Sequence, residues 1–305
     1  MTEEEMNDQP TPDRARIGFL GLGDQGRPMA ISIARAGRHL TVFDVRRDAM
    51  TGFTELGAMV AASADEVVRN SDIVAFCLRD EDQVTQLMLG DSKLLEAMTA
   101  GQVLVMHSTV SPRFAQRLAA LAEGRGVGFL DAPVSGSSVE ARDRGALAVF
   151  VGGTARDFKQ AQPLFTAIGE HVELLGPVGS GEVVKLCNNL MLFCNTFATF
   201  EAARLATAYG ISADTMVSMT RHGSGRSWSL EEWGFWHRMM PDHPARTREA
   251  MIKFLNKDLL LALDAARGVH VELPMGERAE AIAPGVIGGI WDEVHAPSGA
   301  PSSEA

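Results

Sequence analysis

The first half of the chain alternates short apolar runs with segments in which apolar residues recur at helical spacing. Runs that are apolar on both faces indicate strands buried between two layers of helices. The runs lie at Arg16–Leu20, Leu40–Val45, Asp72–Leu78, Gln102–Thr109, Val127–Asp131, Ala146–Val151 and His171–Leu174. Helical patterns lie between them, at Gly26–Ala36, after the capping box that begins at Ser63, at Glu81–Leu89 and at Ser111–Glu123. This alternation predicts an α/β domain with a parallel, doubly wound sheet.

The second half has the pattern of helices alone. From Glu182 to Tyr209 the chain contains neither Pro nor Gly, and Gly210 then provides a stop signal. This predicts a helix of about 28 residues, ~42 Å long at 1.5 Å per residue. A helix this long and apolar is expected either to join two domains or to pack against a second subunit. Further helical patterns follow at Ala213–Arg221 and Ala250–Arg267.

The change of pattern predicts an α/β domain over residues 14–179 and an all-α domain over residues 180–291. We expect residues 1–13 and 292–305 to be disordered tails. The stretch before the second tail contains Pro284-Gly285 and Gly288-Gly289, which are typical of loops rather than of a regular terminal helix.

Composition narrows the class of protein. Hydrophobic residues make up 46% and charged residues 22% of the 305 residues, which excludes a disordered chain. The net charge of −11 disfavours nucleic-acid binding. Much of this negative charge lies in the expected tails. The net charge is therefore a property of the chain ends rather than of a ligand site. No apolar run is long enough to span a membrane, and we expect the acidic segment Met1–Asp13 not to be a signal peptide. Three cysteines are too few for a disulfide framework, which favours a cytoplasmic location.

A glycine-rich loop follows the first predicted strand and begins the first predicted helix. Gly21-Leu22-Gly23-Asp24-Gln25-Gly26 fits G-x-G-x-x-G, which binds dinucleotides. The first glycine allows a tight turn, the second lets the backbone approach a pyrophosphate, and the third allows helix and strand to pack closely. The helix N-terminus then offers N–H groups to the phosphates. Asp24 must point to solvent or cap the helix, because a carboxylate beside a pyrophosphate weakens binding.

Asp44 ends the second predicted strand, about 20 residues beyond the loop, where a carboxylate binds the adenosine ribose. A carboxylate repels a 2′-phosphate, so Asp44 favours NAD as the cofactor. NADP remains possible, because Arg46 and Arg47 could accept that phosphate if Asp44 turned away.

Three further motifs lie later in the chain. They are Asp131-Ala132-Pro133-Val134-Ser135-Gly136, the segment Gly179–Asn189 (GSGEVVKLCNN) and Lys257-Asp258-Leu259. Together with the glycine loop, these motifs resemble the β-hydroxyacid dehydrogenase family, the group that includes 3-hydroxyisobutyrate dehydrogenase. The resemblance extends from about Arg16 to about Pro274. It implies a Rossmann-type NAD(P)-binding domain followed by an all-α domain for substrate binding and dimerisation.

Lys185 and Asn189 are the candidate catalytic residues. They are spaced i, i+4 and therefore share one face of the long predicted helix, near its N-terminus. A lysine ammonium can give a proton to a carbonyl oxygen during hydride addition, or take it back in the reverse direction. The resemblance implies that Lys185 is the acid/base and that Asn189 assists it. The alternative is a solvated surface lysine.

The resemblance also implies a substrate site at the turn Ser135, Gly136 and Ser137, where a carboxylate would bind. Ser137 replaces the usual second glycine of the motif, which leaves open whether the substrate is that of other members. Arg226 in the segment Ser224–Trp228 either recognises an anion or pairs with an acidic residue of this chain. Trp228, Trp233 and Trp236 belong either to a core or interface or to the substrate cleft.

Further cofactor contacts are implied for Leu78, Thr109 and Lys257. Leu78 is assigned through its backbone alone, because Arg79 replaces the usual proline. Asp258 could pair with a basic group and hold it. His107 is interpreted as a strand-end residue rather than a catalytic one.

The leading hypothesis is an NAD-dependent oxidoreductase that moves a hydride between nicotinamide and a small 3-hydroxy acid or its semialdehyde. Its partners would be a small anionic substrate and further copies of itself, as a homodimer or homotetramer. One alternative is an NADPH-dependent imine reductase, which resembles this family but generally lacks the lysine. The other is a non-enzymatic dinucleotide-binding interaction protein. We expect no metal site.

Overall fold

The computed structural model describes residues 15–90, 93–136, 143–241, 243, 245 and 247–296. This described part divides into two compact units, one ending at Lys185 and the other beginning at Leu186. The first unit contains all the described strands and the second contains helices. The predicted fold class, an α/β domain followed by an all-α domain, is therefore confirmed.

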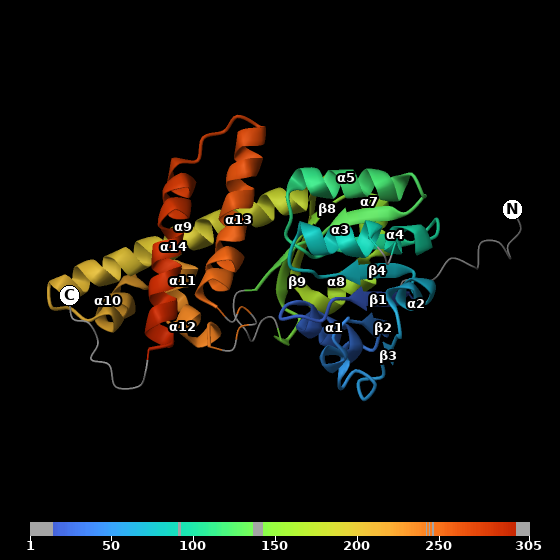
Figure 1. The fold of residues 1–305 in the computed structure, drawn as a ribbon, viewed down its shortest axis with the longest axis horizontal. Helices are drawn as coiled ribbons and strands as arrows, with labels where there is room; N and C mark the ends of the chain where they lie inside the picture. Colours follow the sequence, from blue (N-terminus) through green and yellow to red (C-terminus); the bar gives the residue numbers. More distant parts are fainter. Residues whose placement is uncertain are drawn as a thin grey trace, which may run out of the picture. The chain divides into compact units, whose positions relative to one another are not determined.

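The first unit is built around one sheet, with the strand order β3-β2-β1-β4-β5-β6-β8-β7 and with β9 paired to β8 (Figure 1). From β3 to β6 every pair is parallel. These strands are β1 (Arg16–Leu20), β2 (His39–Phe43), β3 (Met59–Val60), β4 (Ile73–Phe76), β5 (Val103–Met106) and β6 (Gly128–Asp131). The direction of strand addition reverses between β1 and β4, which is where sheets of this kind bind ligands at their carboxyl edge.

The far end of the sheet is not parallel. Strand β8 (Leu147–Gly152) runs antiparallel to β6 and to β7 (Val134–Ser135), and only its pairing with β9 (Gly169–Gly176) is parallel. The expectation of a wholly parallel sheet is therefore wrong here. Strands β6 and β7 keep one antiparallel register with β8, in which Asp131 pairs with Gly152 and Val134 with Val149, so the chain reverses between β7 and β8. Residues 136–146, which join these two strands, are fewer than the dozen or more that a parallel crossover requires.

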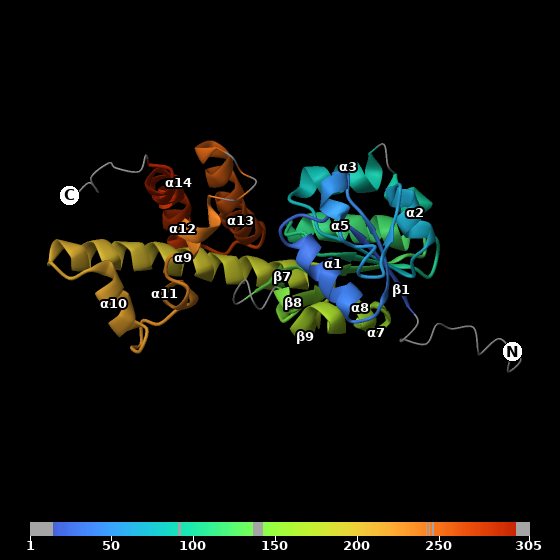
Figure 2. The same cartoon turned by 90° about the horizontal axis from the view of Figure 1, so that it is seen from below.

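Helices cover both faces of the sheet (Figure 2). One face packs against α1 (Gly26–Arg35), α7 (Ala155–Gln160) and α8 (Gln162–Ile168). The other face packs against α2 (Ala64–Arg69), α3 (Glu81–Leu89), α4 (Leu94–Ala97) and α5 (Pro112–Glu123). The serine half of the predicted capping box is present, because the Ser63 hydroxyl accepts the Glu66 N–H at 3.3 Å, while the Glu66 carboxylate accepts the Ala62 N–H at 2.7 Å. A short 3-10 turn, η2 (Arg47–Met50), follows β2.

A single helix, α9 (Ser180–Ala208), begins in the first unit and continues into the second. The second unit then contains α10 (Ala213–Thr220), α11 (Trp228–Glu231), α12 (Phe235–Met239), α13 (Arg248–Gly268) and α14 (Pro274–Val294). Helices α13 and α14 lie side by side (Figure 1). Their core includes Phe193, Phe197, Trp236, Leu255 and Ile287.

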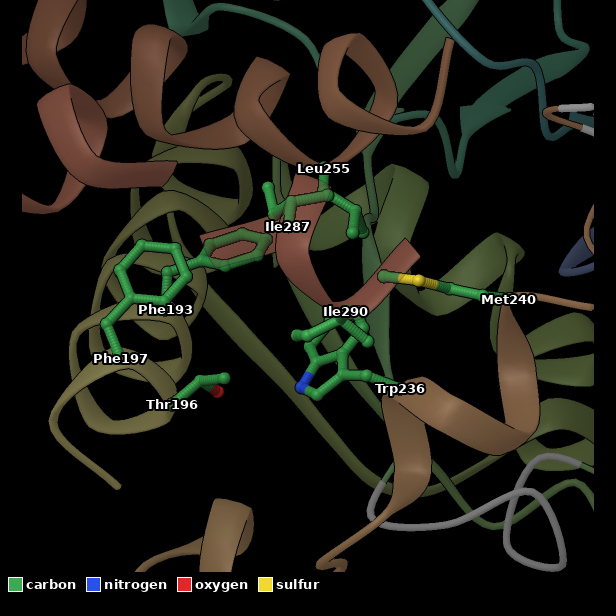
Figure 3. A pocket seen from close by; sticks show the side chains of 8 residues that line it. All are labelled: Phe193, Thr196, Phe197, Trp236, Met240, Leu255, Ile287 and Ile290. Carbon is green, nitrogen blue, oxygen red and sulfur yellow. The ribbon is translucent and has the colours of Figure 1, made fainter. Parts of the chain in front are cut away.

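This core contains a small apolar pocket (Figure 3). Its one polar lining residue, Thr196, is already satisfied: the hydroxyl donates to the Leu192 carbonyl at 2.7 Å and lies 2.8 Å from the Ser229 hydroxyl. The pocket is therefore a packing gap between rings and aliphatic side chains, not a polar ligand site.

Helix α14 corrects two sequence expectations. It passes through Pro284-Gly285 and Gly288-Gly289 and ends at Val294. The predicted tail, residues 292–305, is therefore not disordered at its start. Asp292 forms an ion pair with Arg248 at 3.2 Å, and a carboxylate oxygen of Glu293 lies 3.1 Å from the His237 Nε2. Gly288 is a packing residue, because a Cβ there would lie 2.0 Å from the Arg248 guanidinium. Packing against α13 outweighs the low helix propensity of these residues.

None of the described helices is both long and apolar enough to span a membrane.

Candidate active site

The glycine loop has the geometry that its sequence predicts. Gly21 has φ +84, and a Cβ there would lie 2.5 Å from the Cys77 carbonyl oxygen. A Cβ on Gly26 would lie 1.9 Å from the Gly21 carbonyl oxygen, so α1 can pack this closely only with glycine. In contrast, nothing lies within 4 Å of a Cβ on Gly23. The first and third glycines are therefore required by the fold, whereas the second leaves open space for a phosphate.

The N-terminus of α1 is available to an anion. Gln25 occupies its N-cap position without a side-chain cap, and the first turn carries no acidic residue. Asp24 is exposed, and Leu22 is buried. The first amides of α1 and the positive end of its dipole therefore fit a pyrophosphate.

Asp44 lies directly after β2 and is held there by the loop. One carboxylate oxygen accepts the Leu22 N–H at 2.6 Å, and the other accepts the Arg46 N–H at 2.8 Å. The Arg46 guanidinium lies 3.6 Å from the same carboxylate. Although Asp44 is buried, a carboxylate has further lone pairs with which to accept ribose hydroxyls.

A hollow opens beside Asp44. Its lining includes Phe43, Val45, Arg47, Thr54 and Ala61. Arg27 supports this wall: its guanidinium donates to the carbonyls of Ala49 and Thr51 and lies 5.2 Å from the centre of the Phe53 ring. The role of Arg27 was not predicted, because its partners follow more than 20 residues later.

The turns after β4 and β5 meet at the carboxyl edge of the sheet. The Leu78 N–H donates to the Ser108 hydroxyl at 2.7 Å, which joins the two turns, and Thr109 follows half-buried. His107 is buried as expected: its Nδ1 lies 2.7 Å from the Ala132 carbonyl oxygen, and burial lowers its pKa to about 4. A neutral, enclosed imidazole agrees with a structural role.

The predicted substrate turn is only partly described. Ser135 is half-buried at the end of β7, and Gly136 follows it exposed. Ser137 lies outside the described residues.

Lys185 is half-buried on the second turn of α9, and Asn189 lies one turn further on, buried. Within the second unit the Asn189 amide donates to the Asp258 carboxylate at 2.6 Å. The Asn188 side-chain amide donates in turn to the Asn189 side-chain oxygen Oδ1 at 2.9 Å, and the Lys257 ammonium lies 3.1 Å from Asp258. Asp258 therefore pairs with a basic group as expected, and it also fixes Asn189.

The remaining candidates lie elsewhere in the second unit. Arg226 is exposed in the turn before α11. Trp236 belongs to the core, with its ring 6.1 Å from Phe193 and 6.5 Å from Trp228. Trp233 donates to Asp214 at 3.1 Å. For Trp236 the core interpretation of the tryptophan cluster is therefore correct.

Comparison with known proteins identifies the family. The model described as the NAD binding domain of 6-phosphogluconate dehydrogenase matches residues 16–176. The model described as NAD-binding of NADP-dependent 3-hydroxyisobutyrate dehydrogenase matches residues 179–287. The NAD-dependent L-serine dehydrogenase of Pseudomonas aeruginosa is 38% identical over 87% of this chain and 89% of its own length. The chain belongs to the β-hydroxyacid dehydrogenase family.

Other relatives agree with this assignment. The 3-hydroxyisobutyrate dehydrogenase of Pseudomonas aeruginosa is 36% identical over 86% of this chain and 89% of its own length. A solved structure of 3-hydroxyisobutyrate dehydrogenase with L-serine, from Mycobacterium tuberculosis, has a TM-score of 0.77 and 28% identity, covering 92% of this chain and 99% of the other. This β-hydroxyacid dehydrogenase is thus an NAD(P)-dependent oxidoreductase that acts on hydroxy acids.

The imine reductases are more distant. The imine reductase from Pseudomonas sp. has a TM-score of 0.61 at 16% identity, covering 92% of this chain and all of the other, which shows a shared fold alone. The hydroxyacid dehydrogenase hypothesis is therefore favoured over the imine reductase alternative.

Two buried carboxylates at the start of α9 were not predicted from the sequence. Asp131 was assigned only as part of a motif, yet its carboxylate accepts backbone N–H groups at the start of α9. Glu182 is also buried at this point. Charged residues inside a largely apolar stretch were the available signal, because a buried carboxylate needs partners.

Proposed function

We propose that this dehydrogenase oxidises a small 3-hydroxy acid, such as L-serine or 3-hydroxyisobutyrate, with NAD. The names of its relatives support these two compounds. The observation that carries the proposal is the pair Lys185 and Asn189, one turn apart on α9, with the amide of Asn189 fixed by Asp258. A lysine with an oriented amide beside it suits proton transfer at a substrate oxygen.

Lys185 is the proposed acid/base. NAD, when bound, supplies the acceptor for the hydride that leaves the carbinol carbon. The neutral Lys185 amine takes the hydroxyl proton as the C=O bond forms, and in the reverse direction the ammonium returns that proton. Asn189 assists by keeping the substrate oxygen aligned with the Lys185 amine for proton transfer.

The substrate carboxylate is proposed to bind at Ser135, Gly136 and Ser137. The exposed Arg226 guanidinium is a second candidate anion-binding group. A serine hydroxyl and backbone N–H groups suit a carboxylate, and the position of Ser135 at a strand end supports this assignment.

For the cofactor, we propose that Gly21 to Gly26 bind the pyrophosphate and that Asp44 binds the adenosine ribose. Leu78, Thr109 and Lys257 are proposed to contact the nicotinamide half. The carboxylate of Asp44, held by two backbone N–H groups, supports NAD as the preferred cofactor, and Arg46 beside it leaves NADP possible.

We further propose residues 14–179 and 180–291 as the functional domains and a cytoplasmic homodimer or homotetramer as the assembly. Exposed apolar side chains along α9 support an assembly, among them Val183, Met191 and Leu205. The three cysteines are free thiols, which supports a reducing compartment.

The test is a screen of NADH formation by purified protein with L-serine, 3-hydroxyisobutyrate, glycerate, 4-hydroxybutyrate and sulfonate-bearing alcohols. Turnover of one of the 3-hydroxy acids with NAD is expected, and turnover with NADP is expected to be slower. Activity on cyclic imines with NADPH, without oxidation of any hydroxy acid, would overturn the proposal.

A further inference from the structure

Asp131 joins the end of β6 to the beginning of α9. Its side chain is fully buried, and its two carboxylate oxygens accept the Gly179 N–H at 2.8 Å and the Glu182 N–H at 2.9 Å. The Gly181 N–H also interacts with this carboxylate. The first amides of a helix have no acceptor within the helix. Asp131 therefore caps α9 from 48 residues earlier in the chain, as an enclosed acceptor.

Glu182 connects the start of α9 back to the sheet domain. It lies in the first turn of α9, and its side chain is as deeply buried as that of Asp131. One of its carboxylate oxygens accepts the Val110 N–H at 3.2 Å, in the turn that follows β5. The start of α9 is therefore bonded to two neighbouring strand ends, through Asp131 to β6 and through Glu182 to the turn after β5.

Glycines allow the backbones at this junction to approach one another closely. A Cβ on Gly181 would lie 2.2 Å from the Phe150 carbonyl oxygen and 2.7 Å from the Asp131 carbonyl oxygen. A Cβ on Gly152 would lie 2.4 Å from the Asp131 carboxylate. The backbones of β6, β8 and α9 are thus in direct contact, and the first turn of α9 cannot rotate or slide without breaking these contacts.

The next turn of the helix carries Lys185. It follows Glu182 by three residues and Gly181 by four, so it lies on the face of α9 that is anchored at the junction. The first turn of a helix fixes the axis of the turns that follow it. Consequently the junction sets the direction in which the Lys185 side chain leaves the helix.

We propose that Asp131 and Glu182 are positioning residues that fix Lys185 for proton transfer by anchoring the first turn of α9. The inference rests on the proposed role of Lys185 as acid/base. Neither carboxylate need touch substrate or cofactor. A displacement of about 1 Å in a reacting group can lower a rate about 100-fold, so a loosened anchor is enough to slow turnover.

The groups around the junction give the proposal a pH signature. Asp131, Glu182 and Lys185 are its charged residues, and His107 faces it through the Ala132 carbonyl. Burial raises the pKa of Asp131 to about 6, whereas burial keeps His107 neutral down to about pH 4. A change of charge at Asp131 therefore occurs within the range in which turnover can be measured.

The experiment compares Asp131→Asn, Glu182→Gln and Glu182→Ala in the full chain. Asp131→Asn replaces one acceptor oxygen with an N–H donor that faces backbone N–H groups. We expect kcat to fall about 10- to 100-fold, with KM and the NADH dissociation constant changed less than about threefold. Glu182→Gln keeps an acceptor for the Val110 N–H and is expected to retain most of kcat. Glu182→Ala removes that acceptor and is expected to lose most of kcat.

The pH profile separates positioning from a general loss of structure. The limb of the kcat profile that depends on Lys185 should move in Asp131→Asn and Glu182→Ala, whereas damaged packing would lower kcat by one factor at every pH. Thr154→Ala, which removes the cap of α7, is the matched control and should leave kcat and its profile unchanged.

The outcomes distinguish this inference from the proposed function. If Lys185→Ala keeps full turnover, the role of Lys185 fails and the positioning proposal fails with it. If Lys185→Ala is inactive but Asp131→Asn and Glu182→Ala keep the wild-type kcat and profile, the positioning proposal alone is overturned. If Asp131→Asn does not fold, the comparison of Glu182→Gln with Glu182→Ala decides the question by the same criteria.

Discussion

The side-chain amide of Asn189 donates a 2.6 Å hydrogen bond to the carboxylate of Asp258 and thereby joins α9 to α13. Asn189 is buried, and the second oxygen of Asp258 faces the Lys257 ammonium at 3.1 Å. Asp258 thus determines which way the Asn189 amide faces, so the proposed assisting residue depends on a partner 69 residues away.

Asp258→Ala is expected to lower both stability and turnover. A hydrogen bond to a charged acceptor contributes about 1.5–3 kcal/mol, and its loss leaves a buried amide N–H unsatisfied. We expect a lower midpoint of thermal unfolding and a fall in kcat of about tenfold. A double-mutant cycle with Asn189→Ala measures the coupling: additive effects on kcat would contradict the linkage.

The glycine loop offers a pair of substitutions with opposite outcomes. Gly26→Ala places a Cβ 1.9 Å from the Gly21 carbonyl oxygen and is expected to destabilise the first unit by about 3 kcal/mol or more. Gly23→Ala meets open space, so it should fold normally and bind NADH more weakly. Urea unfolding and NADH fluorescence titration measure the two effects. Equal stability losses in both variants would contradict the assigned roles.

The preference for NAD should depend on Asp44. Asp44→Ala removes the acceptor for ribose hydroxyls and for the Leu22 N–H, so NADH affinity is expected to fall at least tenfold. NADPH should lose less, because the repulsion of the 2′-phosphate disappears while Arg46 and Arg47 remain. The dissociation constants of both cofactors give the ratio. An unchanged ratio would show that selectivity has another source.

Much of the fold and of the cofactor loop could be predicted from the sequence because the signals are local. Strand and helix periodicity, the capping box at Ser63 and the three loop glycines act within a few residues. The partners of Asp131 and Asn189 lie 48 to 69 residues away, and no short pattern encodes them. The antiparallel direction of β8 and the path of α14 through Pro284 were also missed, because packing decides both.

The buried carboxyl of Asp131 predicts a specific pH dependence of stability. Its pKa is raised from 3.8 to about 6, so the fold disfavours the ionised form relative to the unfolded chain. Its contribution to stability is therefore fully present below about pH 4 and decreases as pH rises through about 6. At 1.36 kcal/mol per pKa unit, the loss is about 3 kcal/mol.

The difference in the free energy of unfolding between wild type and Asp131→Asn isolates this effect, since His107 titrates in both proteins. Denaturant unfolding should show that the wild type loses stability relative to Asp131→Asn as pH rises from 4 to 7. A difference that is constant with pH would mean that Asp131 titrates at its ordinary pKa.

The central claim is that Lys185 handles the substrate proton, and Lys185→Ala tests it most directly. The purified variant should bind NADH with the wild-type dissociation constant, because Lys185 lies outside the glycine loop and the Asp44 site. Its kcat for the hydroxy acid that the wild type oxidises should fall by at least 100-fold, the upper range of general acid–base catalysis being about 10⁴-fold. NADH binding with full turnover in this variant would contradict the account.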